Sequence, residues 1–361
     1  MEEVSFDFDQ HREQSIDEFR EVRGLYESLA ETTERILRDT LNAANVSTHS
    51  IQARTKTVDS FGNKASKPSS ANPLEPKYAN PLEEITDLSA ARIITYLPGT
   101  ISDVCSCIES EFSILEKIDK ADELMDEGKF GYHSVHFLVT LSEERTRLSE
   151  YKRFTGLVFE IQVRTILQHA WAEMEHDIQY KSASVIPAVI RRRFIALAGM
   201  LEIADREFQA LQEDDQALRV QARKSVKSGN FSNVEITPDA LKTYLDGKLG
   251  GDARQTDVSY EICAEYLNHL GFTNLQQLDN CLKPYNDDSV CRALWGSRQG
   301  QITRFESVLL ASMGHIYIER HPWSKDDYWK KAFPEWLQLI IEAKIIIGSY
   351  DPLLDISNQK H

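Results

Sequence analysis

Three polar residues with reactive side chains alternate with apolar residues in FEIQVRT, the stretch from Phe159 to Thr165. Successive side chains of a strand point to opposite faces of a sheet, so Glu160, Gln162 and Arg164 are predicted to share one face. A carboxylate, an amide and a guanidinium would then line one surface near the end of a strand. A half-exposed edge strand followed by an amphipathic helix, ending near Lys181, is the plainer alternative.

A second carboxylate, Asp87, stands just before the β-branched run ARIITYL, Ala91 to Leu97. If the strands that carry Asp87 and Glu160 are neighbours, the two carboxylates meet. Two carboxylates together with substrate phosphates suit a hard divalent ion, and no matching set of His or Cys ligands indicates zinc or copper. The sequence therefore predicts a Mg²⁺ site at Asp87 and Glu160.

Three cations lie close together in HSIQARTKTVDSFGNK, at Arg54, Lys56 and Lys64. The formal net charge of the chain is −16, and a basic cluster in an acidic protein favours an anionic ligand. A solvated helix start, capped by Ser60 or Asp59, is the alternative for this segment.

The elements that must position these residues form an α+β or α/β pattern. Strands are predicted at 91–97, 113–118, 130–140 and over the Glu160 stretch, and helices at 102–112 and after Arg164. The strand at 130–140 places Tyr132, Ser134 and His136 on one face. The order strand, helix, strand, strand, strand, helix predicts a small mixed sheet with helices against it.

Two long amphipathic helices flank this core. The first runs from Ile16 to Asn45 and packs on the core, and the second from Pro187 to about Ser225. The proline-bearing stretch 66–82 excludes a regular helix and predicts a connection. Beyond Gly229 the texture is helical throughout, so we expect three regions: an N-terminal helix within 1–48, a core at 49–228 and a helical domain at 229–361.

Composition limits the class of protein. The acidic total argues against a general nucleic-acid coat, and neither a signal peptide nor a membrane-length apolar run is evident, so we expect a cytoplasmic protein. Five scattered cysteines favour buried thiols over disulfides; a metal site of Cys263, Cys281 and Cys291 with His269 is the weaker alternative.

Taken together, the segments RTKTVDSFGNK, ITDLSAARI, FGYHSVH, EIQVRT and QHAWAEMEHD resemble, in order, the synthetase domain of the RelA/SpoT family. Members of this family are nucleotidyltransferase-like enzymes that make the alarmones guanosine tetra- and pentaphosphate. The resemblance covers roughly Ile16 to Gln212. It implies that residues 49–228 form a pyrophosphotransferase domain that moves the β,γ-pyrophosphate of ATP to the 3′-hydroxyl of GDP or GTP.

The resemblance also implies residue roles. The ATP phosphates would be bound by Arg54, Lys56, Ser60, Lys64 and Arg92. Asp87 and Glu160 would hold Mg²⁺, and Glu160 would act as general base. The acceptor nucleotide would be bound by Tyr132, which stacks on the base, and by His136, Gln162, Arg164 and His169. Such a reaction depends mainly on positioning and charge neutralisation, which fits this set of residues.

Two departures from the housekeeping enzymes bear on the acceptor. Their PKPNGY-like loop is replaced by MDEGKFGY, and too little sequence precedes the synthetase motifs for their hydrolase domain, so we expect no hydrolysis of the product. The GYHSVH form is similar to toxic small alarmone synthetases, including the fused toxin–antitoxin CapRel type. That resemblance implies two further possibilities: pyrophosphorylation of the tRNA 3′-CCA end, and a C-terminal domain that restrains the enzyme until a protein trigger, such as a phage protein, releases it.

Basic residues for guiding tRNA are present at Arg145, Arg147, Lys152, Arg153 and Arg191 to Arg193, although an arginine run such as the last is more often a solvated helix face. A degenerate domain that only senses nucleotide is an alternative of another class. The presence of both Asp87 and Glu160 weighs against it, because a non-catalytic sensor has no need of both carboxylates.

Overall fold

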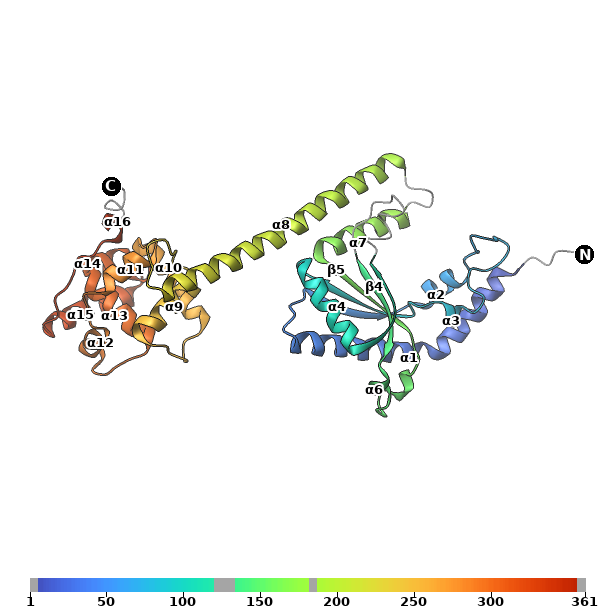
Figure 1. The fold of residues 1–361 in the computed structure, drawn as a ribbon, viewed down its shortest axis with the longest axis horizontal. Helices are drawn as coiled ribbons and strands as arrows, with labels where there is room; N and C mark the ends of the chain where they lie inside the picture. The colour runs from blue at the N-terminus through green and yellow to red at the C-terminus, as the bar shows by residue number, and fades with distance from the viewer. Residues whose placement is uncertain (1–5, 120–133, 182–186, 356–361) are drawn as a thin grey trace, which may run out of the picture. The chain divides into compact units, whose positions relative to one another are not determined.

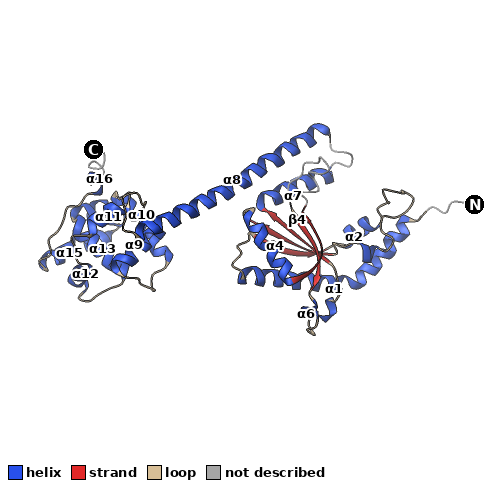
Figure 2. Ribbon diagram, viewed as in Figure 1, coloured by secondary structure: helices blue, strands red, loops and turns tan. Residues whose placement is uncertain are grey.

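The computed structural model describes residues 6–119, 134–181 and 187–355 of the 361-residue chain. The chain divides into two compact units, Met1–Leu211 and Gln212–His361, and each is considered by itself. Strands of the described chain belong to the N-terminal unit, as Figure 2 shows.

A mixed five-stranded sheet forms the centre of the N-terminal unit. Its strands are β1 (Ser50–Thr55), β2 (Ser89–Thr95), β3 (Phe112–Asp119), β4 (Val135–Leu141) and β5 (Phe159–Thr165), arranged in the order β1-β2-β5-β4-β3. The central pair, β2 and β5, is parallel, and the other neighbours are antiparallel. The predicted mixed sheet is confirmed, and its four expected strands are present. The sequence missed β1, in which Ile51 and Thr55 are the β-branched residues.

Helices flank the sheet (Figure 1). In this unit they are α1 (Phe8–Ala43), α2 (Val58–Ala65), α3 (Pro81–Glu84), α4 (Gly99–Glu111), α6 (Glu143–Thr146), the 3₁₀ turn η1 (Lys152–Phe154), α7 (Ile166–Lys181) and the first part of α8 (Ala188–Lys227). Apolar residues of α1 and α4 form one core with those strand residues that alternate away from Glu160, such as Ile93, Ile161 and Val163 (Figure 1). The opposite face of the sheet is left for polar side chains.

Close packing between α1 and α2 fixes the segment that follows β1. The ring of Phe61 is fully buried and stacks on Phe19 at 4.5 Å between centroids. Gly62 lies so near Ile16 that a Cβ atom there would come within 2.5 Å of the Ile16 side chain. The N-cap of α2 is Thr57, whose hydroxyl accepts a hydrogen bond from the Ser60 backbone N–H. The expected cap at Ser60 or Asp59 is therefore wrong, because the cap lies two residues before Asp59 and three before Ser60.

A capping box starts α7 directly after β5. The hydroxyl of Thr165 accepts from the backbone N–H of Gln168 at 3.1 Å, and the Gln168 side chain accepts from the Thr165 N–H at 2.7 Å. The same Thr165 hydroxyl donates to Asp205 of α8 at 2.7 Å, a buried contact. Trp171 of α7 packs beside Phe194 and Ala198 of α8, so the two helices lie side by side (Figure 1).

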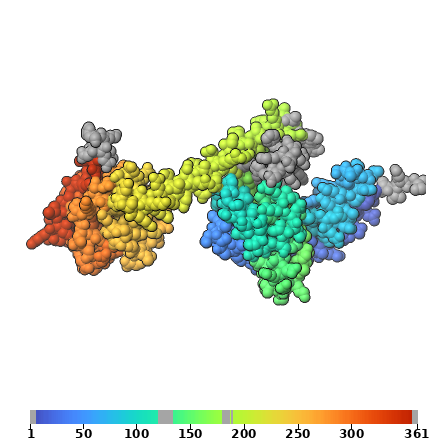
Figure 3. Space-filling view, viewed as in Figure 1, coloured from blue at the N-terminus to red at the C-terminus, as the bar shows by residue number. Residues whose placement is uncertain are grey.

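The segment between β4 and β5 carries α6 and η1, and it protrudes from the surface of the N-terminal unit (Figure 3). Its basic residues are partly paired, since Arg145 contacts Glu111 and Arg147 lies 3.7 Å from Glu143. Arg191 to Arg193 are exposed on α8, as expected of a solvated face.

The C-terminal unit is helical. It contains α9 (Pro238–Leu249), α10 (Asp257–Leu270), α11 (Leu275–Leu282), α12 (Asp287–Trp295), α13 (Gln301–Met313), α14 (His315–Arg320), η2 (Pro322–Lys325), α15 (Asp327–Glu342) and α16 (Pro352–Asp355). Helix α13 is buried along most of its length. Helices α10 and α12 end at Gly271 and Gly296 in the left-handed conformation that glycine favours.

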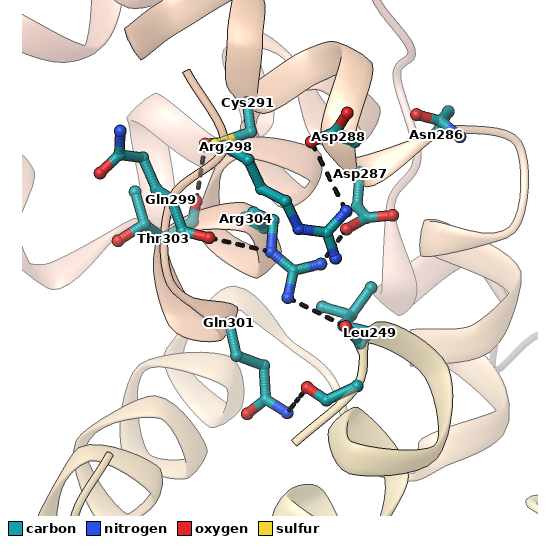
Figure 4. Close-up of polar contacts among 12 residues, drawn as sticks. Leu249, Asn286, Asp287, Asp288, Cys291, Arg298, Gln299, Gln301, Thr303 and Arg304 are labelled. Carbon is teal, nitrogen blue, oxygen red and sulfur yellow. Dashed lines mark hydrogen bonds and ion pairs between the residues drawn. The ribbon is translucent and has the colours of Figure 1, made fainter. Parts of the chain in front are cut away.

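A buried arginine of α13 links the end of α9 to α12 (Figure 4). The Arg304 guanidinium pairs with Asp287 and donates to the backbone carbonyls of Leu249, at 2.9 Å, and Gln299, at 3.2 Å. Its side chain is 5% exposed. Since all these contacts are internal and satisfied, we interpret Arg304 as a structural residue of this unit.

The division between the units falls inside α8, between Leu211 and Gln212, whereas the expected boundary was Gly229, just beyond the helix end. The last turns of α8 pack with the C-terminal helices: Val226 belongs to their core and Ala222 packs against it. A boundary predicted from the end of a helix cannot detect that these last turns of α8 belong to the C-terminal core, because one helix contributes residues to both units.

The cysteines carry free thiols, and four of the five, Cys105, Cys263, Cys281 and Cys291, are buried. Across the described residues no group of three or more His, Cys, Asp or Glu side chains is arranged to hold a metal ion. The alternative of a cysteine-based metal site is therefore wrong for this part of the chain. None of the described helices combines the length and apolar character needed to cross a membrane.

Candidate active site

The polar face of the sheet presents its side chains in two rows. Pairing across β1, β2 and β5 aligns Arg54 with Ala90 and Ala90 with Glu160. The next row aligns Arg92 with Gln162, and Gln162 with His136 of β4. Residues paired in this way share a face, so the expected common face of Glu160, Gln162 and Arg164 is confirmed and extends over four strands.

A chain of hydrogen bonds runs along β5 from Arg164 to Glu160. The Arg164 Nη2 atom donates to Gln162 Oε1 at 2.6 Å, and Gln162 Nε2 donates to Glu160 Oε1 at 3.0 Å. His136 Nδ1 lies 2.6 Å from the same Glu160 oxygen, and its Nε2 lies 2.9 Å from the Ser134 hydroxyl. Two donors therefore hold Oε1 of Glu160, and Oε2 has no hydrogen bond in the described structure.

The second carboxylate, Asp87, is held by two lysines. Lys56 Nζ donates to Asp87 Oδ2 at 2.5 Å, and Lys64 Nζ donates to Oδ1 at 2.9 Å. Lys56 follows β1, where its backbone N–H bonds to the Leu88 carbonyl, and Lys64 lies in the last turn of α2. The segment after β1, the end of α2 and the turn before β2 thus meet at one carboxylate.

Electrostatics keep both carboxylates ionised. Burial raises the pKa of Asp87, but hydrogen bonds from Lys56 and Lys64 outweigh it, and the net pKa lies below its usual range. Burial likewise raises the pKa of Glu160, while hydrogen bonds from His136 and Gln162 lower it further than burial raises it. The charge of Asp87 also acts on Glu160, raising its pKa, so the two carboxylates are near enough to interact.

Three guanidinium groups share this face. Arg164 is 7% exposed, and burial, followed by repulsion from Arg92 and Arg54, lowers its pKa to about 10. Its Nε–H has no hydrogen-bond partner in the described structure. Like charges held this close, with a buried donor left over, favour an anion at this position.

Helix α7 contributes the edge of the site. Arg92 Nη1 donates to Glu173 Oε1 at 2.9 Å, and His169 Nδ1 lies 3.6 Å from the same oxygen. Burial, then Arg164 and Arg92, lower the pKa of His169, so its ring is neutral at pH 7. Sequence reasoning did not single out Glu173 as a site residue, although its place four residues after His169 puts both on one helix face.

The predicted site residues are thus brought together in three connected groups: Asp87 with Lys56 and Lys64, Glu160 with its neighbours on β4 and β5, and Arg92 with α7. Arg54 is exposed on β1, and its positive charge repels that of Arg164 and lowers the pKa of Arg164. Ser60 is exposed in the first turn of α2. Tyr132 lies outside the described residues. Ser134, beside His136, was expected on this face but not as a site residue.

Comparison with known proteins places this site in a recognised domain. Residues 53–185 match the family described as "Region found in RelA / SpoT proteins", so this segment is a RelA/SpoT domain. Two proteins of Bacillus subtilis (strain 168) are similar to it. The GTP pyrophosphokinase YwaC is 25% identical over 132 residues, which cover 37% of this chain and 60% of YwaC. The GTP pyrophosphokinase YjbM is 26% identical over 137 residues, covering 37% of this chain and 61% of YjbM.

The chain therefore spans about three fifths of the length of these relatives. Among solved structures, the small alarmone synthetase 1 from Bacillus subtilis superimposes with a TM-score of 0.46 at 20% identity. That superposition covers 56% of this chain and 99% of the other.

Proposed function

We propose that the RelA/SpoT domain of this chain transfers the β,γ-pyrophosphate of ATP to the 3′-hydroxyl of a guanine nucleotide, GDP or GTP. The observation that carries the proposal is the sheet face on which two ionised carboxylates, Asp87 and Glu160, lie among cations from β1, α2, β2 and β5. The names of YwaC and YjbM, both GTP pyrophosphokinases, support the choice of acceptor.

The donor triphosphate binds to the cations. Lys56, Lys64 and Arg92 reach it from three elements, with Arg54 at the edge of the sheet and Ser60 at the start of α2. Arg92 is suited to a bidentate contact with a phosphate group, which lysine cannot make. The negative charge of the triphosphate also relieves the repulsion among Arg54, Arg92 and Arg164.

The donor set fits a magnesium ion held jointly by protein and substrate. Asp87 and Glu160 are hard oxygen ligands, and Mg²⁺ commonly takes one or two carboxylates plus substrate phosphates. The lack of a third protein ligand among the described residues agrees with such a shared site. When bound, Mg²⁺ neutralises charge on the transferring phosphoryl groups.

Glu160 acts on the acceptor as general base. Its lowered pKa keeps the carboxylate ionised at neutral pH, and Oε2 is the oxygen that the hydrogen bonds from His136 and Gln162 leave open. Glu160 takes the proton of the 3′-hydroxyl as that oxygen attacks the β-phosphorus. The bond from the β-phosphorus to the oxygen bridging it to the α-phosphorus breaks, and AMP leaves with the electron pair.

Acceptor binding is assigned to the remaining residues of the face. Arg164 and His136 bind the phosphates of the acceptor in this proposal, which the unpartnered Nε–H of Arg164 supports. Gln162 hydrogen-bonds to both Arg164 and Glu160 and so fixes the position of one side chain relative to the other. The neutral ring of His169 suits hydrogen bonding to a base, and Tyr132 is proposed to stack on it.

The tRNA 3′ end is the alternative acceptor. The basic segment suggested for it is partly neutralised, since Arg145 and Arg147 are paired with glutamates, and this favours the smaller acceptor. An inactive sensor is disfavoured because it has no need of two ionised carboxylates held side by side with phosphate-binding cations.

Transfer of label tests the proposal. The full chain, with Mg²⁺ and ATP labelled at the γ-phosphate, is incubated with GDP, GTP or deacylated tRNA, and the Asp87→Asn variant serves as control. We expect label in the guanine nucleotides and none with the variant. Label in tRNA alone would replace the acceptor, and label in no acceptor would overturn the assignment as a pyrophosphotransferase.

A further inference from the structure

Both oxygens of Asp87 are occupied by the cations assigned to the donor phosphates. Lys56 Nζ holds Oδ2 at 2.5 Å and Lys64 Nζ holds Oδ1 at 2.9 Å. The three side chains are shielded from water, with exposures of 10% for Lys56, 29% for Lys64 and 21% for Asp87. We call this group the Asp87 latch.

The fold fixes the backbone positions of both lysines of the latch. Lys56 is fixed at the end of β1 by the bond from its backbone N–H to Leu88. Lys64 is fixed through α2, which the Phe61 stack and the close approach of Gly62 press against α1. Ion pairs at such shielded, pre-positioned sites are stronger than exposed pairs on flexible side chains.

A free divalent cation therefore meets an unfavourable site. Asp87 is neutralised by two lysines whose own charges repel the cation, and Oε1 of Glu160 is already held by His136 and Gln162. Among the described residues, no third His, Cys, Asp or Glu side chain completes a group with these two carboxylates that could hold a metal ion. A triphosphate changes each of these conditions, because it offers the lysines anionic oxygens and offers the cation additional ligands.

We infer that this site accepts a divalent cation and the donor triphosphate only together, because the phosphates must draw Lys56 and Lys64 away from Asp87 before its carboxylate can bind the metal. The inference rests on the proposed function for the identity of the donor. The same exchange applies at the edge of the site, where Arg92 leaves Glu173 for a phosphate oxygen. Binding of the two ligands is then coupled, each raising the affinity for the other.

The latch makes a specific prediction about metal binding without nucleotide. We measure Mn²⁺ affinity of the full chain by the loss of the free Mn²⁺ signal in electron paramagnetic resonance. The wild-type chain should bind Mn²⁺ weakly, and Lys56→Met with Lys64→Met should bind it at least ~10-fold more tightly. Methionine keeps much of the length of each side chain while removing the charge.

Two controls identify the cause of the gain. Lys67→Met with Lys77→Met removes the same charge from exposed lysines of the neighbouring segment, and it should leave Mn²⁺ affinity unchanged. Adding Asp87→Asn to the double latch variant should return the affinity to the wild-type value. Equal or weaker Mn²⁺ binding by the latch variant, or an equal gain in the Lys67 and Lys77 variant, would overturn the inference.

Folding of each variant is checked by thermal unfolding. If the double variant unfolds early, Lys64→Met alone is used, because Lys64 is the more exposed of the two lysines, and a smaller gain of the same sign is expected. Mn²⁺ binding does not require turnover, so a chain that transfers no label but shows the gain retains the latch and loses the proposed function. A chain that transfers label but shows no gain in Mn²⁺ affinity in the latch variant keeps the proposed function and loses the latch.

Discussion

Substitution of Glu160 by glutamine isolates the proposed base from its surroundings. Glutamine has nearly the same shape as glutamate, and its single carbonyl oxygen can still accept from His136 and Gln162 as Oε1 does, at 2.6 and 3.0 Å in the wild-type chain. Its amide nitrogen then replaces Oε2, the oxygen assigned to the 3′-hydroxyl proton. Packing is preserved while the base and one negative charge are lost.

The expected loss of turnover follows from these two roles. General-base catalysis contributes roughly 10²- to 10⁴-fold, which corresponds to about 2.7 to 5.4 kcal/mol in the activation barrier. Since the cations assigned to the triphosphate are untouched, most of the loss should fall on kcat, which is the pattern of an interaction made in the transition state. Loss of a metal ligand should raise the KM for ATP by a smaller factor, because metal and triphosphate bind together.

The assay is the initial rate of label transfer to GDP and GTP over a range of ATP concentrations. Glu116→Gln is the matched control. Glu116 of β3 pairs with Leu138 of β4, and Leu138 pairs with Glu160, so Glu116 lies on the same face of the sheet as Glu160. Its side chain is exposed. It should leave turnover unchanged. A Glu160→Gln chain that keeps more than about a tenth of wild-type turnover would refute the base role. An increase in KM that accounts for the whole loss would make Glu160 a binding residue instead.

Two further substitutions test the phosphate site and the C-terminal core. Arg92→Lys keeps the charge but loses the bidentate fork, so the KM for ATP should rise about tenfold in the label-transfer assay; an unchanged KM would remove Arg92 from the donor site. In α13, burial raises the pKa of Glu306 to about 7, although a hydrogen bond from Tyr266 opposes the change. The folded chain then keeps a proton that the unfolded chain releases near pH 4.3, so stability is full below about pH 4, falls by at most ~4 kcal/mol towards pH 7 and is level above it. Glu306→Gln should abolish this slope in urea unfolding followed in the C-terminal unit, and a slope that persists in the variant would assign it to other groups.

Alternation along a strand was sufficient to predict the face that carries Glu160, Gln162 and Arg164, because a strand places side chains by a period of two whatever lies next to it. It could not predict the partners across the sheet. The strand β1 was missed since its six residues include Gln52 and Arg54 and give only a short apolar pattern; pairing with β2 stabilises it. Glu173 was missed because its partner Arg92 is 81 positions away in the sequence, and strand alternation does not predict such a contact.

The order of the motifs implied which cations belong with the phosphates, but not what those cations contact in the absence of phosphate. Lys56, Lys64 and Asp87 are 8 to 31 residues apart in sequence. The pairing of β1 with β2 brings Lys56 to Asp87, and the packing of α2 on α1 brings Lys64 there. A motif therefore identifies the participants of a site, whereas the pairing that sets its resting charge depends on tertiary structure.

The position of the unit boundary gives a last prediction, on how the chain can be divided. A chain that ends at Leu211 keeps the contacts of α8 with the N-terminal unit: the Thr165–Asp205 bond at 2.7 Å, the Trp171 packing, and the bond from the Gly99 N–H to Gln209 at 3.0 Å. A chain that ends at residue 228 also carries Ala222 and Val226 without the core that buries them. Exposed apolar residues on such a helix favour association.

Residues 1–211 should therefore unfold cooperatively and transfer label. Residues 1–228 should also transfer label but associate more strongly than 1–211 in size-exclusion chromatography, because Ala222 and Val226 are added without their core. Failure of 1–211 to fold would contradict the division into two compact units. The same pair of chains tests the restraint suggested for the C-terminal domain, because removal of a restraining domain must raise the rate of transfer. Rates of 1–211 and the full chain that agree within error would exclude restraint under the assay conditions and leave the C-terminal unit a role that does not act on turnover.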